Sequence, residues 1–162
     1  MALNANLRVE GQKQGVIKGS VLQKGREDSI LVIAFNHEVL SPRDLVSGQP
    51  TGQRQHKFLT ITKEIDRATP LLLNAFVTNE LLKKWELRFW RPMPSGIDKQ
   101  FFTIQLLNAS ITDIKMEMLN NAYPENLNHK ECEHISFSYQ KISWTYEEGA
   151  LTAADDWMGA RA

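Results

Sequence analysis

The chain has 162 residues, of which 42% are hydrophobic and 23% are charged, and its 19 basic residues balance its 19 acidic ones. This is the composition of an ordinary globular protein, and the length predicts one domain spanning residues 1–162 with a short C-terminal tail. Because a dedicated nucleic-acid binder usually carries a basic excess, the balanced charge disfavours nucleic acid as a partner.

The cysteine content and the first residues bear on where the protein is made. Cys132 is the single cysteine, so no internal disulfide can form, as suits a protein that folds in a reducing compartment. The N-terminal MALNANLRVEG lacks the basic and apolar regions of a cleaved signal peptide, and no apolar run is long enough for a membrane span. We therefore expect a chain that is cytoplasmic when synthesised, without stable membrane insertion. If it leaves the cell, something other than a classical signal carries it.

The first long predicted strand is SILVIAFNHEVL, residues 29–40, in which side chains alternate between two faces. One face carries Leu31, Ile33 and Phe35, which are bulky enough to fill a core. The opposite face has smaller and then polar side chains, and it includes Val32, Ala34, Asn36 and Glu38. We expect the bulky face to point inward and the smaller face to meet a partner or a lumen.

A long polar connection and the one predicted helix come next. The segment between Leu40 and Lys57 is rich in proline and glycine, and a connection of this length inside a compact domain is usually functional or disordered. After the alternating strand LTITKE, Thr69 is predicted as the helix N-cap and Pro70 as the first helical residue, followed by LLLNAFVTNELL.

Three further segments have strand patterns: WELRFWRP, FFTIQLLNASITDIKMEML and HISFSYQKISWTYEE. In the last, the apolar side chains shift by one position near Gln140 and Lys141, which predicts a β-bulge. In the tail, Trp157 is predicted as a docking point. Together these patterns predict a mainly β fold, a compact β-barrel with one flanking α-helix and a long extended loop.

Candidate chemical groups are few. His129, Cys132 and His134 in HKECEH are residue types that zinc prefers, but a fourth ligand at a familiar spacing is missing and a polar loop is the favoured interpretation. Ser138 and Lys141 match an S-x-x-K spacing, yet that motif belongs at a helix start and here falls in a strand. We assign no metal site, cofactor or catalytic residue, and we expect the protein not to be an enzyme.

The densest charge cluster runs from Thr51 to Leu72, and composition alone would explain it equally well as a solvated rim of mixed sign. Its strand-to-helix corner ITKEIDRATPLL, preceded by SGQPTGQRQHK, closely resembles the hemolysin-coregulated protein family, the inner-tube subunits of the type VI secretion system. The resemblance also includes LRVEG near the start, REDSILVIAFNHEV, ISFSYQKISW and ADDW. It therefore covers nearly the whole chain.

This resemblance implies a structural function. Family members form six-membered rings of β-barrel subunits, and the rings stack into a hollow tube. A contractile sheath drives the tube, tipped by a spike, out of the bacterium, and the lumen can carry small effectors. The implied partners are further copies of the chain in a stacked homo-hexamer, the spike protein, the sheath and small effector proteins. We therefore expect secretion without a cleaved signal peptide.

The resemblance also assigns roles to residues. The smaller face of the first long strand, Val32, Ala34, Asn36 and Glu38, is expected to face the lumen and its effectors. The long loop and the charged corner are expected to form the seams within and between rings, through Asp44, Gln49, Arg54, His56, Lys63, Glu64, Asp66 and Arg67. The alternative reading of the sequence is a monomeric β-barrel that binds a ligand or nucleic acid.

Overall fold

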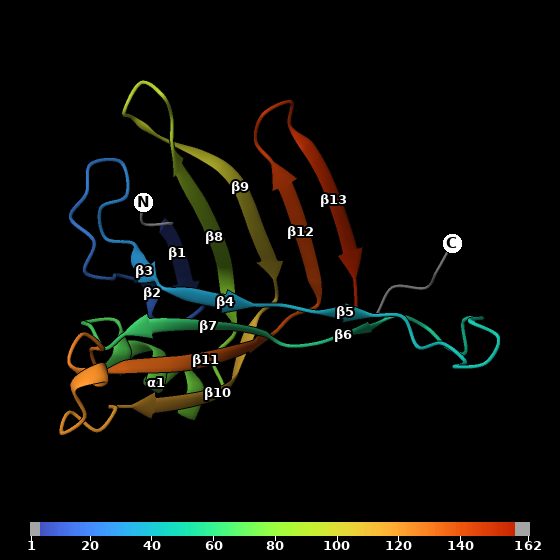
Figure 1. Ribbon diagram of the computed structural model, residues 1–162, viewed down its shortest axis with the longest axis horizontal. Helices are drawn as coiled ribbons and strands as arrows, with labels where there is room; N and C mark the ends of the chain where they lie inside the picture. The colour runs from blue at the N-terminus through green and yellow to red at the C-terminus, as the bar shows by residue number, and fades with distance from the viewer. Residues whose placement is uncertain (1–3, 158–162) are drawn as a thin grey trace.

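The computed structural model describes residues 4–157, which form thirteen β-strands, one α-helix and one short 3-10 helix (Figure 1). The α-helix is α1 (Thr69–Val77) and the 3-10 helix is η1 (Pro124–Asn126). No helix in this part of the chain has the length and apolarity needed to cross a bilayer. The prediction of a mainly β fold is confirmed.

The larger sheet contains seven antiparallel strands in the order β13-β12-β9-β8-β1-β2, with β3 also paired to β1. Their bounds are β1 (Asn4–Gly11), β2 (Gly15–Ile17), β3 (Ile30–Val32), β8 (Leu82–Pro92), β9 (Asp98–Leu107), β12 (Lys141–Tyr146) and β13 (Leu151–Asp156). Strand β13 is an edge strand, and its first half is exposed.

The smaller sheet has four strands in the order β10-β11-β7-β4, and Figure 1 shows them running across the strands of the larger sheet. Their bounds are β4 (Ala34–Asn36), β7 (Leu59–Glu64), β10 (Ser110–Glu117) and β11 (Cys132–Ser138). A separate ribbon pairs β5 (Val39–Leu40) with β6 (Gln55–His56). Among the described strands the two main sheets are not joined into one ladder, so the predicted closed barrel is not confirmed.

The chain passes from one sheet to the other at three corners, where the sequence pattern had suggested continuous strands. Ile33 separates β3 from β4, residues 108–109 separate β9 from β10, and residues 139–140 separate β11 from β12. The one-residue shift near Gln140 is therefore real, but it marks a corner between two sheets. The prediction of a β-bulge there was wrong.

The core consists of apolar side chains that both sheets bury. Trp85 of β8 lies edge-on to Phe137 of β11, with ring centroids 5.3 Å apart. Leu72 and Ala75 lie on the buried face of α1, and the helix packs against β10. Removing such side chains from water is the main source of stability for a domain of this kind.

Core packing reverses the predicted faces of β3. Antiparallel pairing sets Val32 opposite Ala5 of β1, and residues opposite one another project from the same face of a sheet. Val32 is therefore only 3% exposed, whereas Leu31 is 41% and Ile33 54% exposed. The assignment of Val32 to a lumen was wrong. After the corner, all three residues of β4 are exposed.

Helix α1 also differs from its prediction at both ends. Ala68 is the N-cap residue and Thr69 already lies in the helix, where its hydroxyl donates to the buried Glu133 instead of capping the helix. The helix ends at Val77 although apolar residues continue the pattern. Asn79 has a left-handed φ of 52°, and the backbone N–H of Glu80 donates to the carbonyl of Ala75 at 2.8 Å, an arrangement that terminates helices.

Candidate functional site

A hairpin arm, residues 39–56, projects beyond both sheets (Figure 1). The ribbon of β5 and β6 forms its base, and a bridge between Arg43 and Pro50 continues the pairing toward the tip. The predicted long loop is therefore an ordered two-stranded extension. Its length separates the tip from the core of its own subunit.

The tip of the arm is held locally and presents apolar side chains to solvent. One carboxylate oxygen of Asp44 accepts hydrogen bonds from the backbone N–H groups of Val46 at 3.0 Å and Ser47 at 2.6 Å. These bonds lower the pKa of Asp44, with Ser47 contributing most. The turn that they stabilise leaves Leu45 and Val46 almost completely exposed, at 101% and 97%.

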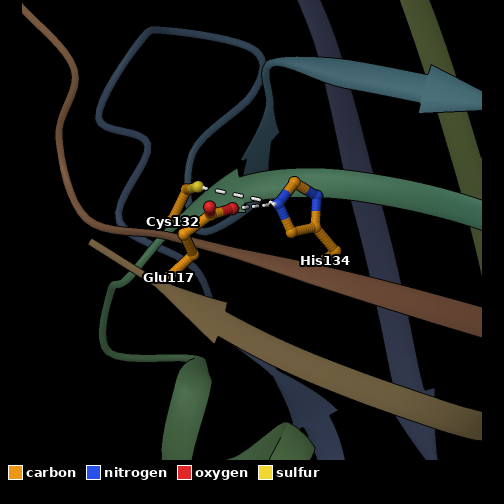
Figure 2. Close-up of side chains that lie close together, drawn as sticks. All are labelled: Glu117, Cys132 and His134. Atoms are coloured by element: carbon orange, nitrogen blue, oxygen red, sulfur yellow. Dashed lines mark hydrogen bonds and ion pairs between the residues drawn. The ribbon is translucent and has the colours of Figure 1, made fainter. Parts of the chain in front are cut away.

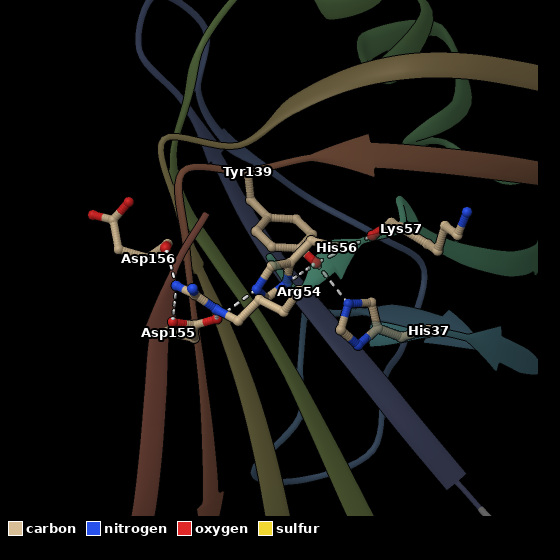
Figure 3. A network of polar contacts seen from close by, with 7 residues as sticks. All are labelled: His37, Arg54, His56, Lys57, Tyr139, Asp155 and Asp156. Carbon is tan, nitrogen blue, oxygen red and sulfur yellow. Dashed lines mark hydrogen bonds and ion pairs between the residues drawn. The ribbon is translucent and has the colours of Figure 1, made fainter. Parts of the chain in front are cut away.

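A polar network joins the base of the arm to the C-terminal strand β13 (Figure 3). Arg54 forms a two-pronged ion pair with Asp155, through Nε and through Nη2 at 2.6 Å, and it also donates to the carbonyl of Asp156 at 3.0 Å. His56 Nε2 lies 2.6 Å from the same Asp155 carboxylate. Chiefly because Arg54 stabilises the charged form, and with help from His56, the pKa of Asp155 falls to about 2.

Tyr139, at the corner between β11 and β12, continues this network inward. Its hydroxyl donates to the carbonyl of Lys57 at 3.1 Å and lies 3.0 Å from His56 Nδ1 and 2.6 Å from His37 Nε2. Burial raises the pKa of Tyr139, and the Asp155 charge adds to that rise. Burial lowers the pKa of His37, with a further contribution from His56. The tyrosine thus remains a hydroxyl donor that fixes the direction of the arm.

Trp157 closes the outer side of the network. Its ring centroid lies 5.2 Å from that of Tyr139 and 5.7 Å from that of His56, and its backbone N–H donates to the carbonyl of Gln140 at 2.7 Å. The prediction that Trp157 docks onto the domain is confirmed.

The corner from Lys63 to Thr69 forms a second charge cluster, and the centre of this cluster is buried. Lys63 pairs with Glu133 of the neighbouring strand, and both side chains are 0% exposed. Lys63 Nζ also lies 3.0 Å from an Asp66 oxygen, while Thr69 Oγ1 donates to Glu133 at 2.8 Å. These bonds lock β7, β11 and the start of α1 together inside one subunit.

An apolar groove lies where β1, β8 and β9 meet the corner between β3 and β4. Phe35 and Phe89 form its aromatic wall, with ring centroids 5.2 Å apart. The other apolar residues lining it include Ala5, Val32, Trp90 and Phe101. Because Phe35 is itself 42% exposed, the groove offers apolar area to a second surface.

Near the same corner at Ile33, at the end of the smaller sheet where β10 ends and β11 begins, three potential metal ligands converge (Figure 2). Glu117 ends β10, and Cys132 and His134 lie on β11. One ligand atom from each of the three lies within 4.8 Å of the others. Burial, followed by the charges of Glu117 and Glu133, raises the pKa of the Cys132 thiol.

Comparison with known proteins identifies the family to which this chain belongs. The family model described as "Type VI secretion system effector, Hcp" matches residues 7–146. A relative from Pseudomonas aeruginosa, named "Major exported protein", is 42% identical over 166 aligned residues, with 97% of this chain and 96% of the relative covered. The chain belongs to the Hcp family.

Solved Hcp structures share the fold. One, described as the crystal structure of an Hcp protein, is 33% identical with a TM-score of 0.90, covering 98% of this chain and 100% of that one. Another, the secreted protein Hcp3 from Pseudomonas aeruginosa, is 34% identical with a TM-score of 0.78, covering 98% and 100% of the two chains. The resemblance predicted from the strand-to-helix corner is confirmed.

Within this Hcp chain, the residues expected at assembly seams separate into internal and external groups. Lys63 and His56 are buried and contact residues of their own subunit, so their assignment to a seam was wrong. Asp44 and Gln49 are exposed on the arm, and Arg54 holds its base. The remaining residues are partly or largely accessible: Glu64, Asp66 and Arg67.

Sequence reasoning missed the partners that organise these Hcp sites. His37, Tyr139 and Asp155 are far apart along the chain, and no local spacing predicts their convergence. Glu117 was likewise missed beside Cys132, because it belongs to the preceding strand. A correct pairing of β10 with β11 would have revealed it, since Glu117 lies directly opposite Cys132.

Proposed function

We propose that this chain is a structural subunit of the type VI secretion tube, forming hexameric rings that stack into a hollow tube. The proposal includes expulsion of the tube by the contractile sheath behind the spike protein, and carriage of small effectors in the lumen. Family membership and the exported relative support it. No catalytic role is invoked for any described residue.

The single observation that carries the proposal is the arm. Leu45 and Val46 form an apolar tip held away from their own core, and exposing such a tip is unfavourable unless another surface covers it. The apolar groove around Phe35 is a different surface of the same molecule. A ring or stack requires contacts between two different surfaces of each copy.

The network of Arg54, His56 and Tyr139 supports the same function by aiming the arm. A contact made by a flexible loop loses conformational entropy when it forms, whereas an arm already fixed to β13 loses less. The exposed edge of β13 is a further surface through which neighbouring copies can meet.

Native mass spectrometry and electron microscopy test the proposal. We expect assemblies with the mass of six 18.5-kDa chains, and stacked rings at high protein concentration. The double variant Leu45→Ser, Val46→Ser should reduce stacking while leaving the melting temperature of the subunit nearly unchanged. The matched control is Leu22→Ser, which alters an apolar side chain that is 90% exposed away from the arm.

A different result would contradict the proposal. A wild-type chain that stays monomeric at high concentration and binds oligonucleotides in a salt-sensitive manner would favour the monomeric binding protein. Stacking equally impaired by Leu22→Ser would show that the arm tip has no special part in assembly.

A further inference from the structure

The cluster of Glu117, Cys132 and His134 contributes nothing to the proposed assembly, yet its three side chains are arranged toward one point (Figure 2). Glu117 and Cys132 lie opposite one another on paired antiparallel strands. His134 is two residues after Cys132, so it projects from the same face of β11. The sheet itself therefore brings a carboxylate, a thiol and an imidazole together.

The distances suit a single shared ion. His134 Nε2 lies 3.2 Å from Glu117 Oε2 and 4.0 Å from Cys132 Sγ. Zinc binds sulfur at about 2.3 Å and imidazole nitrogen or carboxylate oxygen at about 2.0–2.2 Å. Both of these separations are shorter than the sum of the two bonds concerned, and all three ligand atoms lie within 4.8 Å of one another, so one ion placed between them is within bonding reach of His134 and each of its two neighbours.

Thr62 on β7 fixes the orientation of the histidine. Its hydroxyl oxygen lies 2.9 Å from His134 Nδ1, and the two residues are opposite one another in the β7–β11 pairing. An imidazole whose Nδ1 donates to this oxygen carries its lone pair on Nε2, the atom that faces Glu117 and Cys132. Metal-binding histidines are commonly held by such a second hydrogen bond.

We infer that Glu117, Cys132 and His134 form a binding site for a divalent cation that accepts thiolate, imidazole and carboxylate ligands, with Zn²⁺ as the best match. The three protein ligands leave a fourth coordination position. That position opens into a depression lined by residues of the 118–131 loop and its neighbours, among them His129, Asn128 and Glu64. A water molecule can complete a tetrahedron there.

The depression beside the ligands carries charges of both signs, since Lys130 and Glu64 line it and form an ion pair with one another at 3.5 Å. As the sulfur–metal bond forms, the Cys132 thiol gives up its proton to water. Because Glu117 and Cys132 flank the 118–131 loop, the ion would also hold the two ends of this loop together.

The experiment uses the full chain without a histidine tag, kept reduced with a phosphine rather than a thiol. Titration with Co²⁺ should produce a thiolate-to-cobalt charge-transfer band in the near ultraviolet with one ion per chain, and Zn²⁺ should abolish the band by competition. Cys132→Ser should remove it. Glu117→Gln and His134→Gln should each weaken Co²⁺ binding more than about tenfold, since each removes one of three ligands.

Two further variants distinguish a preorganised metal site from nonspecific metal binding. Thr62→Val keeps the shape of the side chain and removes the hydrogen bond to His134, so we expect an affinity loss of about 10–100-fold. Glu125→Gln is the matched control, because Glu125 is an exposed carboxylate in the same 118–131 loop and lies outside the ligand cluster. It should leave the affinity unchanged.

The inference is overturned if the wild type gives no charge-transfer band. It is also overturned if Glu117→Gln and His134→Gln bind Co²⁺ as tightly as the wild type, since the thiol would then act alone. Glu117→Gln and His134→Gln both leave Cys132 intact, so the test stands even if Cys132→Ser fails to fold. None of these readouts depends on ring formation, and failure here leaves the proposed tube function unaffected.

Discussion

Lys63 of β7 and Glu133 of β11 lie directly opposite one another and form an ion pair in the interior of the subunit, with both side chains 0% exposed. The lysine ammonium also donates to the carbonyl of Glu64 at 2.9 Å and contacts Asp66 and Thr69. Such additional bonds offset part of the cost of burying two charges, although Oε2 of Glu133 accepts no hydrogen bond. The strand-to-helix corner ITKEIDRATPLL therefore stabilises the interior of its own subunit through Lys63.

Removing one partner of this pair should destabilise the fold strongly. We expect Lys63→Met to lower the free energy of unfolding by about 3–5 kcal/mol, because Glu133 would remain buried without a counter-charge. Chemical denaturation measures the change. The matched control is Lys130→Met, which removes a surface ion pair with Glu64 at 3.5 Å and should cost less than about 1 kcal/mol. Equal effects of the two variants would contradict the structural role of the buried pair.

Asp155 makes stability depend on pH in the acidic range. Its pKa is about 2 in the folded chain against an ordinary value of 3.8, so the unfolded chain binds more protons between these values. The stabilising contribution is therefore complete above about pH 5 and is lost as the pH falls toward about 2. We expect the stability difference between wild type and Asp155→Asn to be larger at about pH 6 than at about pH 3.

Urea denaturation at the two pH values measures this difference. Glu148→Gln, an exposed substitution in the turn between β12 and β13, is the control and should show little difference at either pH. A stability gap for Asp155→Asn that does not change with pH would mean that the Arg54 and His56 contacts do not favour the ionised carboxylate.

Local patterns predicted this fold where neighbouring residues determine the outcome. Alternation located the segments around Trp85 and Ile135, and Pro70 marked the start of the helix. The same patterns misassigned Val32, because the buried face of a short strand is decided by its partner. Only the pairing of Val32 with Ala5 in β1 shows which side meets the core.

The candidate sites depended even more on contacts between distant segments. The charge cluster was visible in the sequence, but the burial of Lys63 follows from Glu133, which lies far along the chain. Thr69 had the residue type of an N-cap, yet its hydroxyl bonds to that same glutamate. The exposed tip at Leu45 is a local feature, and the expectation that the long polar loop makes contacts outside its own domain stays a prediction.

The exposed strand β4 provides the last prediction, which rests on the proposed tube. Ala34 and Asn36 remain accessible after the corner at Ile33, as does Glu38 just beyond the strand, whereas Val32 is excluded by its burial. We propose that this shorter surface faces the lumen and contacts effectors, with repeated weak contacts from the copies in a ring adding avidity.

Asn36→Arg should then preserve the ring and reduce effector retention, because a long charged side chain would project into the channel. Asn36→Ser is the matched control: it changes the same position without adding bulk or charge, and it should retain effector nearly as well as the wild type. Co-purification of effectors with the ring, alongside native mass measurement, separates binding from assembly. Unchanged retention of several independent effectors by Asn36→Arg would exclude β4 as the cargo surface. Loss of the ring in that variant would instead place Asn36 at a contact between subunits.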